Sequence, residues 1–191
     1  MQVIDLKRNS RVKANVIIDR EYGGRSTFRQ AVKKGGIGIG SLMYQSGLKE
    51  VDQIKDKEKF YKANIELYNN GLGIYIYNVD DNFLVLLDKE EIESFRISKP
   101  LDVVRPANFS FFSKMMEFGI DYYKCRFMLL EHEIVEHHPV SFHMHLADGS
   151  ELIANVKKMS PYKHCTFFET NALGIPYKEE IHGHLELDEE I

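Results

Sequence analysis

The chain has 191 residues, of which 43% are hydrophobic and 12% aromatic, so it has enough apolar side chains for a sizeable core. Charged residues of both signs make up 28%, and the formal net charge is −4. This balance excludes a disordered chain and argues against nucleic acid or an anionic membrane as the main partner.

Localisation follows from what the sequence lacks. No run approaches the roughly 20 apolar residues that span a bilayer, and the first ten residues show no apolar signal region. The two cysteines, Cys125 and Cys165, do not make a disulfide framework. We therefore expect a cytoplasmic protein without a transmembrane segment and with two buried free thiols.

The N-terminal part predicts elements of mixed character. Residues 11–20 are rich in Val and Ile and predict a strand, and Ser26 is a candidate N-cap for a short helix that ends near Lys34. Residues 35–41 have the Gly-x4-Gly spacing of a phosphate loop but lack the Lys that must follow, so we interpret them as a flexible or close-packed connection. Residues 49–62 predict a weak amphipathic helix or a charged linker.

At residue 63 short apolar segments begin to alternate with turn residues at regular spacing, which predicts an antiparallel meander. The four expected strands cover residues 63–68, 72–77, 83–87 and 92–97. A helix, a long strand and a last aromatic strand are expected at residues 108–118, 122–134 and 165–169. The chain thus divides into an N-terminal segment, a β domain and an acidic tail, at residues 1–62, 63–170 and 171–191.

The strongest hairpin signal is Asp148-Gly149, within residues 140–157. A three-residue loop, Asp148-Gly149-Ser150, places the apolar side chains of both strands on one face and the polar side chains on the other. The apolar set is Phe142, Met144, Leu146, Leu152, Ala154 and Val156. The other face carries His143, His145 and Glu151, and we expect its imidazoles to be exposed.

All eight histidines lie between His132 and His184, and five of them fall between His132 and His145. Imidazole is the commonest metal ligand, and alternate residues on one strand face can supply two ligands to zinc or another divalent metal. The candidate ligands are His143, His145, Glu151 and His132, with His164 as a further candidate. A cupin site also uses His-x-His on a strand, but its later Glu and Gly spacings are missing here. The competing interpretations are a solvated polar face and a pH-sensitive interface.

Two arginines, Arg25 and Arg29, have the Arg-x3-Arg spacing with which the cyclic-di-GMP site of PilZ domains begins. That family also needs an Asp/Asn-x-Ser-x-x-Gly segment on the following strand, and residues 41–47 do not fit it. We therefore expect the two arginines to lie on a solvated helix face.

Carboxylates and histidines alternate at residues 131–137. Catalytic carboxylate pairs are buried and differ in pKa, whereas a charged strand end that runs into a His-His-Pro turn is ordinary. No Ser or Cys lies in a recognisable nucleophile elbow. The sequence assigns no catalytic residue and no bound cofactor, and it favours a protein that is not an enzyme.

The order of strands and turns after residue 63 resembles the bacterial pleckstrin-homology-like (PH-like) and GRAM-like domains. The sequence segments that carry the resemblance are residues 64–75, 88–97 and 141–154. The resemblance covers roughly residues 63–170 and implies a mainly β fold, a PH-like barrel or half-barrel with one or two short helices. The aromatic insert at residues 101–125 is not standard for the family. The first strand pair holds only Lys62 of the basic cluster that binds phosphoinositides in some relatives, so phosphoinositide binding is not implied.

We expect a non-catalytic module that binds a protein partner or a second copy of itself through exposed edge strands and aromatic side chains. The alternative is a metal-binding protein or metal-dependent enzyme built on the strand with His143 and His145. A third interpretation is a small-ligand pocket inside the barrel, lined by Phe111, Phe112 and Met115.

Overall fold

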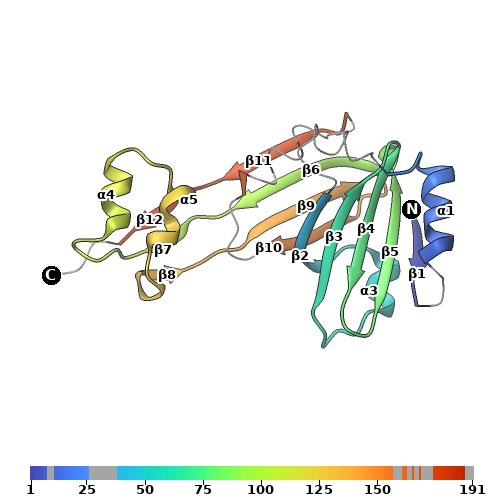
Figure 1. Ribbon diagram of the computed structural model, residues 1–191, viewed down its shortest axis with the longest axis horizontal. Helices are drawn as coiled ribbons and strands as arrows, with labels where there is room; N and C mark the ends of the chain where they lie inside the picture. The colour runs from blue at the N-terminus through green and yellow to red at the C-terminus, as the bar shows by residue number, and fades with distance from the viewer. Residues whose placement is uncertain are drawn as a thin grey trace.

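The computed structural model describes residues 1–7, 11–25, 38–156, 161–162, 165, 168 and 174–187, and this part of the chain is mainly β with a few short helices. A nine-stranded sheet has the order β1-β5-β4-β3-β2-β10-β9-β6-β11, and a three-stranded sheet with the order β12-β7-β8 lies at the other end of the molecule (Figure 1). The strands of the large sheet are β1 (Gln2–Asp5), β2 (Gly38–Ser46), β3 (Tyr61–Leu67), β4 (Gly71–Tyr77), β5 (Asn82–Asp88), β6 (Ile92–Lys99), β9 (Val140–Leu146), β10 (Glu151–Val156) and β11 (Tyr177–Ile181). Those of the small sheet are β7 (Asp102–Val104), β8 (Ile134–Glu136) and β12 (His184–Glu186). The helices are α1 (Arg11–Glu21), α3 (Lys49–Ile54), α4 (Phe111–Glu117) and α5 (Tyr122–Cys125).

The predicted meander is confirmed for its first three strands, whereas the fourth, β6, pairs with β9 and β11 instead of β5. β3, β4 and β5 pair in antiparallel order, with Ile65 opposite Ile74 and Ile74 opposite Val85. β2 pairs with the free side of β3, and β10 then pairs with β2, so the later strands return to the start of the meander. Among the described residues the sheet ends at β1 and β11 rather than closing, which fits the predicted half-barrel. The described N-terminal residues belong to this sheet, because β1 pairs with β5 and β2 lies between β3 and β10.

The strand predicted at residues 11–20 is wrong, because α1 occupies this segment. Ala14 and Ile18 of α1, with Tyr22 just after it, recur every four residues and pack on Leu84 and Leu86 of β5. The alternate residues of β5 face the main core. Both faces of β5 are therefore buried, which explains its uninterrupted apolar run. Burial at a helical spacing has outweighed the strand propensity of the Val and Ile residues in this segment.

The β9–β10 hairpin has the predicted faces but a different loop. The apolar side chains of both strands are buried, and the histidines lie on the opposite face with Glu151. The Leu146 N–H donates to the Ser150 carbonyl at 2.9 Å, so the loop is residues 147–149 and His145 lies opposite Glu151. The register differs by two residues from the expected one. Because side chains alternate with a period of two, this shift leaves every side chain on its predicted face.

The small sheet and the two helices beside it form what we call the small lobe, residues 101–136 together with 182–187. β6 leads into β7, and β11 leads into β12. Because β11 pairs in parallel with β6 and β12 in parallel with β7, a two-stranded ribbon joins the lobe to the large sheet (Figure 1). α4 confirms the helix predicted at residues 108–118. A third apolar cluster around Phe112 and Tyr122 forms the interior of the lobe.

The long strand predicted over residues 122–134 is wrong. Asp121 caps α5 by accepting the Tyr123 N–H at 2.9 Å, two 3-10 turns follow, and only the last residue of the segment enters β8. The helical turn buries Tyr122, Tyr123 and Cys125 in one apolar cluster, whereas an extended strand would direct Tyr122 and Tyr123 to opposite faces.

The strand predicted at residues 165–169 is also wrong at the two positions that are described, because Cys165 and Phe168 have helical backbone. The Phe168 ring stacks on Phe142 with centroids 5.1 Å apart and fills part of the main core. The predicted helix at residues 26–34 and the last four residues of the acidic tail lie outside the described residues.

The interior of the large sheet is packed with side chains. The cavity bounded there by Ile39, Leu42 and Phe142, among others, measures about 10 Å³, which is at the lower limit for one water molecule. Phe112 and Met115 belong to the cluster inside the small lobe, and Phe111 is exposed. The interpretation of a ligand pocket inside the barrel is therefore wrong. Across the described ranges, no helix is long and apolar enough to cross a bilayer.

Candidate functional site

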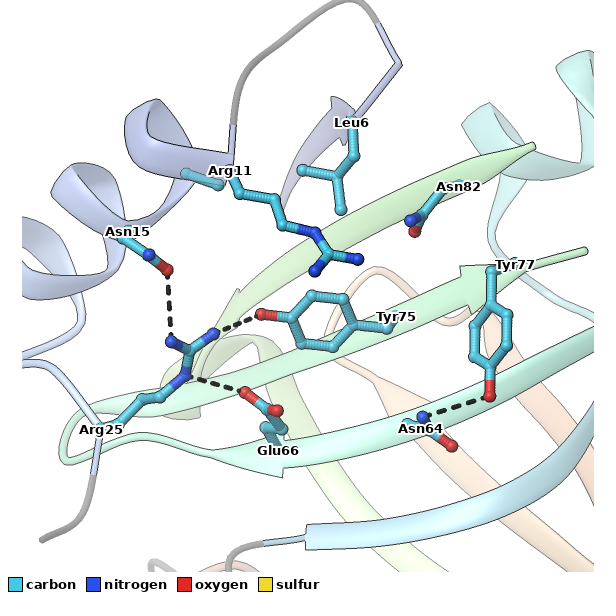
Figure 2. Close-up of a pocket in the computed structure, with 10 residues that line it drawn as sticks. Leu6, Arg11, Asn15, Arg25, Asn64, Glu66, Tyr75, Tyr77 and Asn82 are labelled. Atoms are coloured by element: carbon cyan, nitrogen blue, oxygen red, sulfur yellow. Dashed lines mark hydrogen bonds and ion pairs between the residues drawn. The ribbon is translucent and has the colours of Figure 1, made fainter. Parts of the chain in front are cut away.

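A polar cavity of about 470 Å³ lies between α1 and the outer face of β3, β4 and β5 (Figure 2). This volume is within the range of about 300–1,000 Å³ that is typical of small-molecule sites. Two arginines, one carboxylate, three amides and two tyrosines supply its polar lining. These residues are Arg11, Arg25, Glu66, Asn15, Asn64, Asn82, Tyr75 and Tyr77. We call it the α1 cavity.

Arg25 is fixed at one wall of the α1 cavity by three different elements. Its Nε donates to Glu66 at 3.0 Å, its Nη2 to the Tyr75 hydroxyl at 2.7 Å and its Nη1 to Asn15 at 3.2 Å (Figure 2). Burial alone would lower the pKa of Arg25, but Tyr75 and Glu66 outweigh that effect and raise it. The guanidinium is therefore a permanent, oriented positive charge.

Behind Arg25, a fully buried tyrosine supports the wall of the cavity. The Tyr68 hydroxyl lies 3.4 Å from both Glu66 Oε2 and the Tyr75 hydroxyl, and burial raises its pKa far above the usual range. A Cβ placed on Gly73 would lie 2.5 Å from this hydroxyl. Position 73 must therefore be Gly for Tyr68 to lie across β4.

The cavity also has polar groups without partners. Figure 2 shows the Arg11 guanidinium projecting over the cavity towards Tyr75, and no ion pair to Arg11 is found among the described residues. The side-chain oxygen of Asn82, Oδ1, is buried, and no hydrogen-bond donor reaches it among the described residues. Two arginines face one carboxylate, so the lining carries an excess of positive charge. Such a lining favours an anionic ligand that accepts and donates several hydrogen bonds.

Of the residues of this site, the sequence indicated only Arg25, through its Arg-x3-Arg spacing. Arg25 contacts Glu66 at the end of β3, and the segment Glu66-x-Tyr68-x-x-Gly71 has the same spacing as the second PilZ segment, Asp/Asn-x-Ser-x-x-Gly. Only the glycine is retained, since Glu and Tyr stand at the other two positions. Arg25 is part of the cavity wall rather than a solvated helix face, which corrects that expectation for Arg25, whereas Arg29 lies outside the described residues.

Three of the four candidate metal ligands do come together on the outer face of the β9–β10 hairpin. Nδ1 of His143 lies 2.9 Å and Nε2 of His145 3.4 Å from Oε1 of Glu151. Arg96 of β6 reaches the same place, with its Nη2 3.2 Å from both Glu151 Oε1 and His143 Nδ1. His145 is 37% exposed, as expected, but His143 is only 14% exposed because Arg96 and Glu151 cover it.

This arrangement is an ion-pair network. Burial would raise the pKa of Glu151, but the hydrogen bond from His143 and the charges of His145 and Arg96 lower it. A metal ion entering the cluster would meet the guanidinium of Arg96, which repels it. Over the ranges that the structure describes, no three His, Cys, Asp or Glu side chains are arranged to hold a metal ion. His132 lies in the small lobe, in the turn before β8, and His164 is outside those ranges.

A second buried polar cluster lies where the ribbon enters the small lobe. Asp102 and Lys99 are both fully buried, with Nζ and Oδ1 2.5 Å apart. The Asp102 carboxylate also accepts the Tyr122 hydroxyl at 2.7 Å and the His138 N–H at 2.9 Å, and His137 Nδ1 lies at 3.0 Å. Burial would raise the pKa of Asp102, but these hydrogen bonds, led by that of Lys99, lower it to about 2. Asp102 is thus an acceptor, and His137 must carry its proton on Nδ1.

No protein-family model matches the chain, and no curated protein sequence matches it.

Proposed function

We propose that the protein is a non-catalytic binding module that holds a small phosphate-bearing ligand, of the nucleotide class, in the α1 cavity. The observation that supports this most directly is the pair of arginines across the cavity. Arg25 is held in place by Glu66, Asn15 and Tyr75, whereas Arg11 faces the same space without an ion-pair partner among the described residues. A phosphate group carries more charge than a carboxylate and has enough oxygens to accept from both guanidinium groups at once, which favours a phosphate over a single carboxylate.

The remaining lining suits the other parts of a nucleotide. The rings of Tyr75 and Tyr77 offer flat apolar surfaces for a base, and the amides of Asn15 and Asn82 offer donors and acceptors for its edge. The Arg25-x3-Arg29 spacing matches the first PilZ segment, whereas residues 66–71 keep only the glycine of the second, so cyclic-di-GMP is tested beside GTP and ATP. Glu66 is engaged by Arg25 and Tyr68, so its carboxylate serves to orient these groups, which favours binding rather than proton transfer.

Isothermal titration calorimetry with cyclic-di-GMP, GTP and ATP tests the proposal. Arg11→Ala removes an exposed side chain and should leave the fold intact, so a fall in affinity of at least tenfold is expected for the ligand that binds. Arg20→Ala is the matched control, because Arg20 is exposed near the other end of α1 and does not line the cavity. Absence of saturable binding by all three nucleotides, or equal affinity in Arg11→Ala and wild type, would overturn the proposal.

A second candidate function is binding of a protein partner or self-association through the small lobe. Three phenylalanines of this lobe are strongly exposed, namely Phe109 at 92%, Phe118 at 82% and Phe127 at 71%. Exposed aromatic side chains are typical anchors of protein interfaces. Light scattering over a concentration series should show a dimer that the Phe109→Ser and Phe118→Ser double variant lacks. If the wild type stays monomeric at every concentration, self-association is excluded and a different protein remains to be sought. The resemblance to PH-like domains stays a prediction.

A further inference from the structure

A second cavity, of about 560 Å³, opens in the small lobe beside the buried Asp102 cluster, whose His137 is part of the cavity lining. Four of its lining residues present apolar surface, namely Tyr123, Phe127, Leu129 and Ile134. The Tyr123 hydroxyl donates to the His182 carbonyl at 2.5 Å, so the part of Tyr123 that remains for a ligand is its ring. We call this the Arg126 cavity, after the charged residue in its wall.

Arg126 is poorly matched by its surroundings. Its Nη1 is buried with no hydrogen-bond partner among the described residues, and its Nη2 lies 3.5 Å from His137 Nε2, at the limit of a hydrogen bond. A buried N–H without an acceptor costs about 1–3 kcal/mol, and more when the group is charged. The structure thus leaves one nitrogen of this cation without an acceptor among the described residues, and the other with a long contact only.

In the buried Asp102 cluster beside Arg126, positive charges outnumber negative ones, and Glu133, the other buried carboxylate of the lobe, is engaged by the backbone N–H groups of Ala107 and Leu130. Lys99 and Arg126 contribute two positive charges, and Asp102 contributes one negative charge that Lys99 already engages. His137 donates its Nδ1–H to Asp102, and because burial lowers the pKa of His137 its imidazole is neutral, so its Nε2 is an acceptor and adds no charge. Glu131 is the acidic group among the described lining residues, and it is exposed, where water and salt screen its charge.

We propose that the Arg126 cavity binds a monocarboxylate with an apolar body, such as a medium-chain fatty acid. The carboxylate accepts from the guanidinium of Arg126 and supplies the missing negative charge. The chain lies against the Tyr123 and Phe127 rings and the Leu129 and Ile134 side chains. A ligand of this chemistry satisfies both the apolar lining and the single unmatched cation, whereas a phosphate lacks the apolar body and an alcohol lacks the charge. This site is separate from the α1 cavity and does not depend on the proposed nucleotide binding.

Octanoate is the probe, with 1-octanol and acetate as controls that lack the charge and the chain. Calorimetry on the full chain should show saturable octanoate binding at least tenfold tighter than that of either control. Arg126→Gln should weaken octanoate binding at least tenfold and leave 1-octanol binding unchanged. Arg105→Gln, at an exposed arginine of the same lobe that does not line the cavity, should behave like wild type.

Because Arg126→Gln could disturb the lobe, a measurement on the unaltered protein complements it. Nuclear Overhauser effects are expected between the octanoate chain protons and the methyl groups of Ile134 and Leu129. The proposal is overturned if octanoate and 1-octanol bind equally well, if folded Arg126→Gln retains full octanoate affinity, or if the Overhauser effects to these methyl groups are absent at saturation.

Discussion

Replacing Asp102 by Asn tests whether the buried cluster at the junction of the two sheets is held together by charge. Lys99 and Asp102 are both fully buried, and the Lys99 ammonium lies 2.5 Å from the carboxylate. The Asn side chain has nearly the same shape and keeps an acceptor oxygen for Tyr122 or the His138 N–H. The substitution therefore removes mainly the negative charge and leaves the Lys99 ammonium buried without a counter-ion.

The magnitude follows from complete burial. Removing one partner of a buried ion pair costs about 3–5 kcal/mol, because the charge left behind has lost its solvation as well as its partner. For a chain of this size, each kcal/mol shifts the melting temperature by roughly 2–4 °C. The expected fall for Asp102→Asn is therefore roughly 6–20 °C. Asp80→Asn is the control, because the pair of Asp80 with Lys59 is exposed to water, so its loss is expected to leave the melting temperature close to that of wild type.

The loss should also depend on pH in a defined direction. Burial lowers the pKa of Lys99, and Asp102 counteracts this. Without Asp102 the folded-state pKa of Lys99 falls further below its unfolded value of 10.5. Between the two values the unfolded chain binds more protons, so stability rises with pH. The deficit of Asp102→Asn relative to wild type should thus be smaller at pH 9.5 than at pH 7.

Urea unfolding followed by circular dichroism at both pH values measures these quantities. The double variant Lys99→Met with Asp102→Asn should be more stable than Asp102→Asn alone, because it removes the stranded charge. A loss below about 1 kcal/mol at pH 7, or a deficit that is the same at both pH values, would refute the reasoning from an uncompensated buried charge.

Three further predictions concern other parts of the molecule. Ile18→Ala should lower the free energy of unfolding in urea by about 2–5 kcal/mol, because Ile18 fills the contact between α1 and β5. Val12→Ala is the control and should change it by less than about 0.5 kcal/mol, because Val12 is 71% exposed. Equal losses would mean that α1 does not pack as described. Gly73→Ala should destabilise the protein by roughly 1–3 kcal/mol, because the new methyl group meets the buried Tyr68. A variant as stable as wild type would show that Tyr68 can move aside. The double variant His143→Ala with His145→Ala should have the same metal content as wild type by mass spectrometry, far below one equivalent, because the guanidinium of Arg96 lies among these imidazoles. The metal-site hypothesis would be restored if wild type contained one equivalent of zinc and the variant lost it.

Elements that depend on local signals were predictable. The strands from residue 63 to residue 97 are separated by Asn, Asp and Gly turns, and the structure places them within about two residues of the expected positions. The faces of the β9–β10 hairpin were also predicted correctly, although the loop of the hairpin lies one residue earlier than expected. A register shift of two residues leaves every side chain on the same face, because side chains alternate with a period of two. By contrast, α1 was mistaken for a strand and α5 for part of one, since strand propensity is weaker than burial against a neighbouring element.

The sites themselves depend on contacts that sequence spacing does not reveal. The sequence alone determined a mainly β fold, the polar hairpin face with its histidines, and an Arg-x3-Arg pair of unknown setting. Tertiary structure alone decided that Arg25 meets Glu66 across 41 positions, that Arg96 lies among the histidines, and that Arg126 lines a cavity with its Nη1 buried without an acceptor among the described residues. The physical reason is that turns and side-chain alternation are properties of neighbouring residues, whereas the charge balance and burial of a site are sums over elements that only folding brings together.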